Sequence, residues 1–311
     1  MNNDPLVSII MATWNRAHFI EETLQAINSQ SYLNWECLII DDGGNDNTLE
    51  LITPILEEDK RFTFLKRTKD YKKGLPGCRN YGLDRANGDF IIFFDDDDIP
   101  HPQNLEICVK ELASGKHKFC RYQRAVFTNE FDYNFDVQVN FLSFEIGTND
   151  ISKMIDHTWP FNSCAVMWSK DCFDGLRFNE SLMYAEEWEC YSRILSEEIK
   201  GISIKKTLFY GRKHANSNTG EFWNQNPIRL NSKKNAVRLI TKTLTEKGRL
   251  SPYLFKFLAG LALSFRDKKL LDDIVKIAKP EISQKAFIYF KYEVYPIWAY
   301  FKRLTKRWNI L

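Results

Sequence analysis

The sequence predicts an α/β protein whose mostly parallel central sheet is flanked by helices and followed by a helical C-terminal appendage. Three observations lead to this prediction. Strand-like and helix-like patterns alternate over residues 1–115, clustered carboxylates follow two of the expected strands, and the pattern from residue 228 onward is helical. Repeated strand–helix–strand units form doubly wound parallel sheets, in which ligands bind beyond the carboxyl ends of the strands.

The elements of the first 115 residues follow from their apolar patterns. Residues 7–13 are a continuous apolar run, which is typical of a parallel strand buried on both faces. Residues 17–30 place their apolar side chains on one side of a helix. The other expected elements are a strand at 37–40, a helix at 48–58, a strand at 62–65, a helix at 77–86 and a strand at 89–94.

The rest of the chain falls into two parts. Residues 116–221 are mixed and aromatic-rich, with strands expected at 119–127 and 164–168 and a helix at 185–196. Beyond them, Ser251 and Pro252 are predicted to cap and begin a helix. We expect one domain over residues 1–221, made of the halves 1–115 and 116–221, and a basic, aromatic-rich helical region over 222–311.

Charge is distributed unevenly between these parts. The chain as a whole has a net charge of +2. Residues 1–221 hold 24 Lys and Arg against 35 Asp and Glu, a net charge of −11, whereas residues 222–311 hold 19 against 6, a net charge of +13. Surface fields of opposite sign attract different partners, so the two parts are expected to meet different ligands.

The cysteines and the apolar runs indicate the compartment. The seven cysteines are scattered and form no C-x-x-C pair, which argues against a disulfide framework and against a structural zinc site. Residues 1–5 have neither the basic start nor the apolar stretch of a signal peptide. The longest apolar run of the C-terminal region, 257–263, is too short to span a bilayer. We therefore expect a cytoplasmic protein.

Four consecutive aspartates, residues 95–98, follow the apolar run 90–94 directly. Adjacent carboxylates repel one another and burial raises their pKa values, so packing alone does not explain them. Clustered carboxylates suit a hard divalent cation, which in turn indicates a phosphate or diphosphate nearby. Alternate residues of an extended segment share a face, so either Asp95 and Asp97 or Asp96 and Asp98 can converge on one cation. The alternative is a solvated acidic turn.

A second polar turn, residues 41–48, follows the second expected strand. Its glycines permit close backbone approach, and its carboxylates can accept hydrogen bonds from a base or a ribose. Asp46 or Asn47 could also cap the next helix. Neither G-x-G-x-x-G after the first strand nor a Walker A sequence occurs, which argues against nicotinamide, flavin and P-loop proteins.

The order of these segments resembles that of family 2 glycosyltransferases. The resemblance covers residues 5–115 and extends over 155–220, and its matching segments are 8–16, 39–44, 74, 79–82, 86–91 and 94–102. It implies the Rossmann-like GT-A fold, a nucleotide-diphospho-sugar donor (a UDP-sugar in most members) and Mn²⁺ or Mg²⁺ as cofactor. Residues 1–115 would then be the nucleotide-binding half and 116–221 the acceptor-binding half.

The resemblance also assigns roles on the donor side. It implies that Asp42 recognises the nucleobase and that Thr13 lies where the first strand meets the base and the ribose. Arg79 matches a basic residue near the nucleotide, with a helix-surface arginine as the alternative reading. In the aspartate run it selects Asp97 as metal ligand, places Asp95 and Asp96 toward the ribose or the metal, and leaves Asp98 a supporting or helix-capping part.

The second carboxylate site is the pair Glu186 and Glu187. The family has a Glu-Asp pair here whose second acid is the general base, and this chain has the longer Glu187 at that position. An acidic first helical turn, favoured by the helix dipole, is the alternative reading. Trp188, beside this pair, and Trp159, in a loop at 159–163, are candidates for the acceptor side, together with Glu186. Core packing is the alternative for Trp159.

Two further features bear on ligands. His214, in a late Arg-x-His element, matches a residue that completes the metal site or contacts the diphosphate, although a lone histidine is often structural. Residues 287–308 interleave aromatic and basic residues, a mixture that suits a helix lying on an anionic membrane. A packed appendage or a dimer surface is the alternative. No nucleic-acid-binding motif occurs, so nucleic acid is not expected as a partner.

Together these readings predict an inverting glycosyltransferase with Glu187 as general base. The expected acceptor is a saccharide or a lipid-linked saccharide of cell-surface polysaccharide or lipopolysaccharide synthesis, and the protein would be peripheral on the inner face of the plasma membrane. A nucleotidyltransferase or a nucleotide-sugar hydrolase could use the same metal site. From a different class, a non-catalytic sugar-nucleotide-binding protein could keep the fold.

Overall fold

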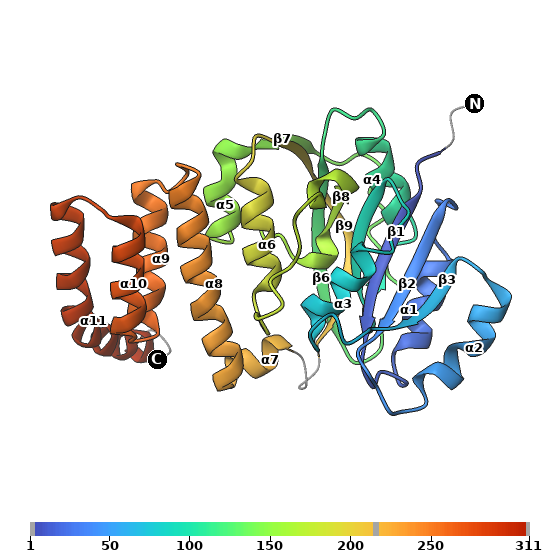
Figure 1. Cartoon of the computed structure of the whole chain (residues 1–311), viewed down its shortest axis with the longest axis horizontal. Helices are drawn as coiled ribbons and strands as arrows, with labels where there is room; N and C mark the ends of the chain where they lie inside the picture. Colours follow the sequence, from blue (N-terminus) through green and yellow to red (C-terminus); the bar gives the residue numbers. More distant parts are fainter. Residues whose placement is uncertain (1–3, 214–217, 309–311) are drawn as a thin grey trace. The chain divides into compact units, whose positions relative to one another are not determined.

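The structure is a computed structural model that describes residues 4–213 and 218–308, and beyond residue 295 it describes the course of the last helix only. The chain divides into two compact units, residues 1–232 and 233–311, and the division falls inside helix α8 (Pro227–Glu246). The sequence placed this boundary at residue 221. The path of the chain through both units can be followed in Figure 1.

Unit 1 is built on a nine-stranded sheet. The strands follow the order β3-β2-β1-β4-β8-β6-β9-β5, and β7 pairs with β9 beside this path. Their bounds are β1 Val7–Thr13, β2 Trp35–Asp41, β3 Phe62–Lys66, β4 Phe90–Asp95, β5 Ile99–Pro100, β6 Phe119–Thr128, β7 Ser143–Gly147, β8 Val166–Ser169 and β9 Lys200–Lys213. The confirmed fold class is therefore mixed α/β, with a central sheet flanked by helices and further helices at the C-terminus.

The connections between β1 and β4 determine where a ligand can bind. β1 pairs in parallel with β2 on one side and with β4 on the other, so the chain reverses its direction of winding between β3 and β4. At the carboxyl ends, Ala12 is paired with Asp95, and Thr13 is paired with Asp41. A crevice outside the carboxyl ends of the strands at such a reversal is where doubly wound sheets bind ligands.

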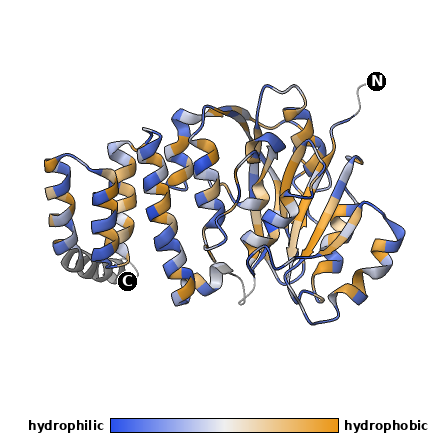
Figure 2. Ribbon diagram, in the orientation of Figure 1, coloured by the Kyte–Doolittle hydropathy of each residue, from blue (hydrophilic) through white to orange (hydrophobic). Residues whose placement is uncertain are grey.

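Helices cover both faces of the sheet. Their bounds in unit 1 are α1 Ile20–Asn28, α2 Thr48–Glu58, α3 Leu75–Leu83, α4 Asn104–Leu112, α5 Ile151–Ile155, α6 Glu186–Leu195 and α7 Asn218–Trp223. Ile9 and Met11 of β1 belong to one core cluster with residues of α1, α2 and α4. Ile10, which points to the opposite face, approaches Gly82 of α3. Burial on both faces explains the apolar runs of the central strands β1, β2 and β4 (Figure 2).

β9 was not predicted from the sequence, because Lys205 and Lys206 interrupt its apolar pattern. Lys206 is nevertheless only 1% exposed. Its ammonium group donates hydrogen bonds to the carbonyl oxygens of Asp136 and Gln138, at 2.5 and 2.6 Å. A buried charge is tolerated when it is paired and hydrogen-bonded, so a lysine can occupy an interior strand position here.

Unit 2 consists of helices, as expected for the C-terminal region. They are the later part of α8, then α9 Pro252–Ser264, α10 Lys268–Ala278 and α11 Ile282–Trp308. Ser251 caps α9 by accepting a hydrogen bond from the Leu254 amide, as the sequence predicted, and Asp267 caps α10 through the Leu270 amide. Within the described part of the chain, no helix is long and apolar enough to cross a membrane.

Gly88, in the turn between α3 and β4, packs against the start of β1 and offers a test of this packing. A Cβ atom there would lie 2.6 Å from the Ser8 amide nitrogen and 2.7 Å from the Leu6 carbonyl oxygen. Because backbone atoms cannot yield as a flexible side chain does, Gly88→Ala is expected to lower the free energy of unfolding by about 1–3 kcal/mol. Urea unfolding measures this. Gly147→Ala, where a Cβ meets nothing within 4 Å, should change it by less than about 0.5 kcal/mol.

Candidate active site

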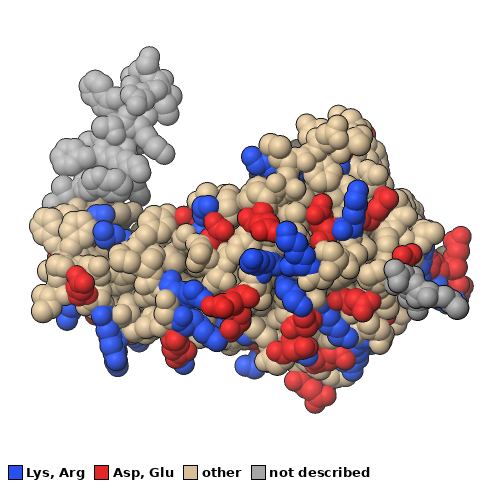
Figure 3. All heavy atoms as spheres, turned by 90° about the horizontal axis from the view of Figure 1, so that it is seen from above, with Lys and Arg blue, Asp and Glu red and all other residues tan. Residues whose placement is uncertain are grey.

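Three groups of carboxylates lie at or beside the carboxyl edge of the parallel strands. Asp41 ends β2 and Asp42 follows it, the aspartate run 95–98 begins at the end of β4, and Glu186 and Glu187 open α6. On the face of unit 1 seen in Figure 3, acidic and basic side chains are interspersed. The carboxylates of the site likewise have basic partners, and these partners determine what each carboxylate can do.

The turn after β2 is held by its own side chains. Asn15, in the left-handed conformation at φ +53°, accepts a hydrogen bond from the Asn45 amide at 2.8 Å. Asp41 accepts one from the Gly44 amide at 2.8 Å. Asp46 accepts hydrogen bonds from both the amide and the hydroxyl group of Thr48. Of the two predicted caps, Asp46 is therefore the one that makes these hydrogen bonds at the start of α2.

Asp42 is oriented by two donors. The Arg67 guanidinium donates to it at 2.6 Å, and the Gly74 amide donates to its other oxygen at 2.9 Å. The Asp42 amide in turn donates to the Thr13 carbonyl oxygen. Sequence reasoning gave Arg67 no role, although its position directly after β3, at the same edge of the sheet, was a usable signal. Arg67 makes the Asp42 carboxylate a charged acceptor with a defined direction.

Thr13 and Asp96 are neighbours at the end of β1. Thr13 is 3% exposed and Asp96 is 6% exposed. Thr13 Oγ1 and Asp96 Oδ2 make no well-aligned hydrogen bond with the described residues, but the Thr13 hydroxyl group lies close enough to the Asp96 carboxyl group to lower its pKa. Burial raises the pKa of Asp96 to about 7; Asp97 adds to the rise and Arg16 opposes it. Buried polar atoms without partners are unusual in native proteins, so these oxygen atoms suit a ligand group or a cation.

Arg16 pairs with the two middle residues of the aspartate run. Its guanidinium lies 3.5 Å from Asp96 and 4.0 Å from Asp97. Both distances are long for a charge-assisted hydrogen bond, so the arginine compensates the carboxylates only in part. Sequence reasoning gave Arg16 no role, although it lies in the segment 8–16 that matches the family.

Asp98 differs from its neighbours because it is bound to protein groups. It is 2% exposed, accepts a hydrogen bond from Arg124 at 3.2 Å, and accepts another from the Arg212 amide at 2.7 Å. These partners lie on β6 and β9, so Asp98 joins the turn to two distant strands. This corrects the expected alternative that Asp98 caps the helix that follows.

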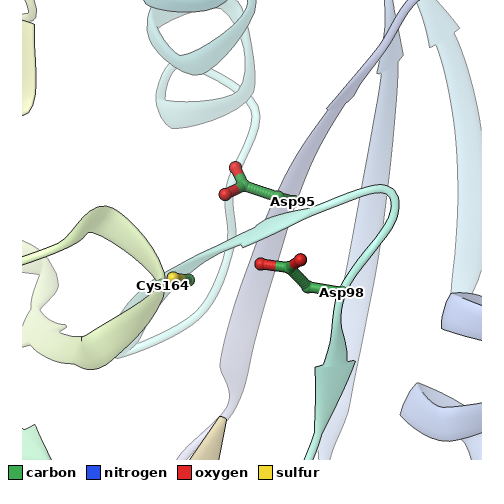
Figure 4. A group of neighbouring side chains, drawn as sticks. All are labelled: Asp95, Asp98 and Cys164. Carbon is green, nitrogen blue, oxygen red and sulfur yellow. The ribbon is translucent and has the colours of Figure 1, made fainter. Parts of the chain in front are cut away.

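Asp95 forms a group with Asp98 and Cys164 that the sequence did not predict. Single ligand atoms of Asp95, Asp98 and Cys164 lie within 4.8 Å of one another, and Figure 4 shows these three side chains. Burial raises the pKa of the Cys164 thiol well above its usual range. A protonated thiol is a poor ligand for a hard cation. Oxygen donors of the aspartate run, among them the unpartnered Asp96 Oδ2, fit Mn²⁺ or Mg²⁺ better.

Arg79 lies inside the protein rather than in the crevice. Its side chain is 3% exposed and lies near the rings of Phe93 and Phe178. It donates to Glu186 at 3.0 Å and to Ser163 at 2.9 Å, and it lies 3.6 Å from Asp95. Because the side chain is buried and its guanidinium is engaged by these groups, the structure gives no support to the expected contact between Arg79 and the nucleotide. Arg79 instead connects the end of β4 with the start of α6.

The start of α6 presents the two glutamates differently. Ala185, just before the helix, has φ +64°, a conformation that costs energy for a residue with a Cβ atom and is found most often where function requires it. Glu186 is 5% exposed and paired with Arg79. Burial, followed by the charge of Glu187, raises the pKa of Glu186 to about 8. Glu187 is only half-buried and is the more accessible carboxylate.

The two candidate tryptophans have different surroundings. Trp188 is 4% exposed and donates its indole N–H to the Ile155 carbonyl oxygen at 3.2 Å. A buried ring is poorly placed to stack on a sugar, so the structure gives no support to the acceptor-side assignment of Trp188, nor to that of the buried Glu186. Trp159 is half-buried. The Lys153 ammonium lies 4.0 Å from the centre of its ring, and the ring of Phe144 also packs against it. Trp159 remains a candidate.

The late basic element is described in part. Arg212 donates to the Asp97 carbonyl oxygen at 3.0 Å and to the Asn129 carbonyl oxygen at 2.6 Å, so it supports the backbone of the aspartate run. His214, the third predicted metal ligand, lies outside the described residues. Nothing in the sequence distinguished the backbone contacts of Arg212 from a contact with phosphate.

Comparison with known sequences gives a family. A family model described as glycosyl transferase family 2 matches residues 8–170. The Escherichia coli UDP-Glc:alpha-D-GlcNAc-diphosphoundecaprenol beta-1,3-glucosyltransferase WfgD is 38% identical over 38% of this chain and 45% of its own length. The Campylobacter jejuni GalNAc(5)-diNAcBac-PP-undecaprenol beta-1,3-glucosyltransferase is 25% identical over 99% of this chain and 86% of its own. The chain spans less than half the length of WfgD and of several other relatives.

Comparison with solved structures gives the fold. S. aureus TarS 1-349 in complex with UDP-GlcNAc matches 93% of this chain and 81% of its own, with a TM-score of 0.64 and 16% identity. The mannosyltransferase PcManGT from Pyrobaculum calidifontis, in complex with GDP-Man and Mn²⁺, matches 96% and 84%, with a TM-score of 0.55 and 17% identity. The expected GT-A fold is thereby confirmed.

The pair of Arg79 and Glu186 predicts a specific pattern of stability. At about pH 9, above the raised pKa of Glu186, Arg79→Met leaves an ionised Glu186 carboxylate buried without its partner and should lower the free energy of unfolding by about 3–5 kcal/mol. Arg79→Met combined with Glu186→Met removes both charges and should recover most of that loss. Urea unfolding of the two single variants and the double variant measures the coupling. Lys116→Met, which breaks an exposed pair with Glu145, should cost less than about 1 kcal/mol.

The raised pKa of Glu186 predicts a pH dependence. Between pH values of about 4.5 and 8 the folded protein keeps a proton on Glu186 that the unfolded chain releases, so this group lowers stability as the pH rises. In Glu186→Gln this contribution is absent. The stability of the variant relative to the parent should therefore increase from pH 5 to pH 8, as measured by urea unfolding at each pH. Parallel stability curves would contradict the assignment.

Proposed function

Because the chain belongs to glycosyltransferase family 2, we propose that it transfers a sugar from a nucleotide-diphosphate donor to a hydroxyl group of a saccharide acceptor. One observation carries this proposal. The buried Arg79 pairs with Glu186 at 3.0 Å and lies 3.6 Å from Asp95, so the aspartate run and the carboxylates of α6 are held beside each other. A transferase needs such proximity between its donor and acceptor groups.

On the donor side, Asp42 and Thr13 contact the base and the ribose, and Asp95 and Asp96 face the ribose and the metal. The direction imposed on Asp42 by Arg67 supports a specific contact with a base. Asp97, with Asp95, would hold Mn²⁺ or Mg²⁺, and His214 is a further candidate for this role. The bound cation supplies charge neutralisation of the departing diphosphate. The oxygen donors of this turn and the unpartnered Asp96 Oδ2 support this choice of cation.

On the acceptor side, Glu187 is the general base. It takes the proton of the acceptor hydroxyl group as that oxygen attacks the anomeric carbon from the face opposite the nucleotide, and the configuration is inverted. Its accessibility supports this role, because Glu186 beside it is buried and already paired with Arg79. Trp159, whose ring is half-buried, is placed on the acceptor side of this proposal.

The proposed substrates follow the names of the relatives. The donor is a UDP-sugar, as in the name of the E. coli relative, and the acceptor is a lipid-linked saccharide, as in the names of both relatives. The reaction would belong to the synthesis of a cell-surface polysaccharide or lipopolysaccharide. A lipid-linked acceptor lies at a membrane, so the proposal includes peripheral contact of the C-terminal region with an anionic membrane on its cytoplasmic face.

The general base and the metal ligand are tested by two variants. Glu187→Gln should bind the donor as the parent does but lower turnover by at least ~10²-fold, since general-base catalysis contributes ~10²–10⁴ in rate. Asp97→Asn should abolish transfer that depends on Mn²⁺. Calorimetry of UDP-sugar binding and a transfer assay measure the two effects. Glu58→Gln, exposed on α2, is the control and should retain parent activity. Parent-like turnover by Glu187→Gln would sink the base assignment.

Product analysis separates glycosyl transfer from other uses of the same site. Mass spectrometry of a reaction with UDP-sugar, Mn²⁺ and a lipid-linked acceptor should show a new glycosidic bond. Free sugar as the main product would indicate a hydrolase, and exchange of labelled pyrophosphate would indicate a nucleotidyltransferase. Donor that stays intact with every acceptor and cation tried would indicate a binding protein.

A further inference from the structure

Unit 2 contains a surface pocket at the junction of α10 and α11. Its volume is about 410 Å³. Three lysines line it together with Val275, Pro280 and Tyr289. Lys276 belongs to the last turn of α10, Lys279 follows that helix in the left-handed conformation, and Lys285 lies in the first turns of α11. The junction therefore gathers three ammonium groups from a short stretch of chain around one hollow.

The charges of this pocket are not neutralised by the protein. Among the described residues, none of the three lysines forms an ion pair, although nearby Lys234 and Arg238 do so with Asp267 and Asp273. Asp272 is the acidic residue that lines the pocket, and it accepts a hydrogen bond from the Tyr289 hydroxyl group at 2.7 Å. Three donors beside one engaged carboxylate suit a phosphate group, whose oxygen atoms accept charge-assisted hydrogen bonds.

The helix that supplies Lys285 and Tyr289 also exposes apolar side chains. Ile282 is 87% exposed, and its spacing to Lys285 and Tyr289 places all three on one side of α11. Phe287 and Phe290 are 48% and 64% exposed. Buried contacts of the described part of α11 centre on Ile288, which is 2% exposed. At 3.6 residues per turn, Phe287 lies about 160° around the helix from Lys285, whereas Phe290 lies about 80° from Ile282. Ile282 and Phe290 are therefore the exposed apolar groups that can meet the same surface as the pocket, an arrangement typical of helices that lie in a membrane interface.

The charge of unit 2 identifies the kind of surface that this face fits. Residues 233–311 hold 18 Lys and Arg against 6 Asp and Glu. In sequence, four of these basic residues follow the pocket at positions 302, 303, 306 and 307. A strongly basic unit is attracted by the negative surface of an anionic bilayer.

We propose that the pocket lined by Lys276, Lys279 and Lys285 binds the phosphate group of an anionic phospholipid while Ile282 and Phe290 enter the interface of the same membrane. This inference deepens the membrane contact of the proposed function and rests on that contact, but it does not depend on the sugar or on the catalytic residues. It assigns unit 2 a phosphate site separate from the diphosphate site at the aspartate run.

The test is binding of the full chain to vesicles. Sedimentation with vesicles of phosphatidylcholine and phosphatidylglycerol is compared with sedimentation with phosphatidylcholine alone. The parent should bind only the first kind, and added salt should weaken that binding. The triple variant Lys276→Gln, Lys279→Gln, Lys285→Gln should bind at least about tenfold more weakly. Ile282→Ser with Phe290→Ser should also weaken binding, and both side chains are exposed enough to leave the fold intact.

A charge-matched control separates the pocket from general attraction. Lys256, Lys268 and Lys269 are exposed in unit 2 and do not line the pocket. Their replacement by Gln removes the same charge and should weaken vesicle binding by less than about threefold. Equal losses in the two triple variants would overturn the pocket as a site. So would binding of inorganic phosphate by calorimetry without any binding to vesicles.

Two further readouts complete the test. Sedimentation equilibrium should show that the parent is a monomer. Self-association of the parent that the apolar double variant abolishes would overturn the membrane assignment in favour of a second copy. Transfer to a detergent-solubilised acceptor should be unchanged in the pocket variant. If no glycosyl transfer is found in any protein while vesicle binding still requires the three lysines, the proposed reaction fails and the phosphate site stands.

Discussion

The arrangement of the site depends on one buried guanidinium group. Removing Arg79 from water is costly, and the cost is offset only where its partners are in place: Glu186, Ser163 and, at 3.6 Å, Asp95. Those partners belong to α6, to the segment before β8 and to the end of β4. The same residue therefore fixes the distance between two carboxylate groups that lie almost a hundred positions apart in the chain.

Neighbouring residues of α3 extend this connection. Asn80 donates to the Phe178 carbonyl oxygen and accepts from the Phe178 amide, and it also contacts Glu180. The loop that leads to α6 is thus attached to the helix that carries Arg79. Gly74, at the other end of α3, donates to Asp42. One short helix, packed on β1 through Gly82, positions groups for all three parts of the site.

Crowding of carboxylates gives the site its chemistry. Burial raises the pKa values of Asp96, Asp98 and Glu186, so ionising these carboxyl groups costs free energy. A cation or a positively charged ligand lowers that cost. Arg16 lowers it in part at the aspartate run, and Arg124 does so for Asp98. For Lys276, Lys279 and Lys285 of unit 2 we propose a different task, the binding of an anionic surface.

The sequence alone determined the alternating elements of the first half, the edge of the sheet that carries the site, the family resemblance and the carboxylates that matter. Apolar periodicity and the residues at strand ends are local properties, so they can be identified in the sequence alone. Tertiary structure decided that Arg79 and Trp188 are buried, that Asp98 joins β6 and β9, and that Arg67 orients Asp42. Burial and long-range pairing depend on which segments pack together. β9 was not predicted because the partners of its buried Lys206 lie in a distant loop.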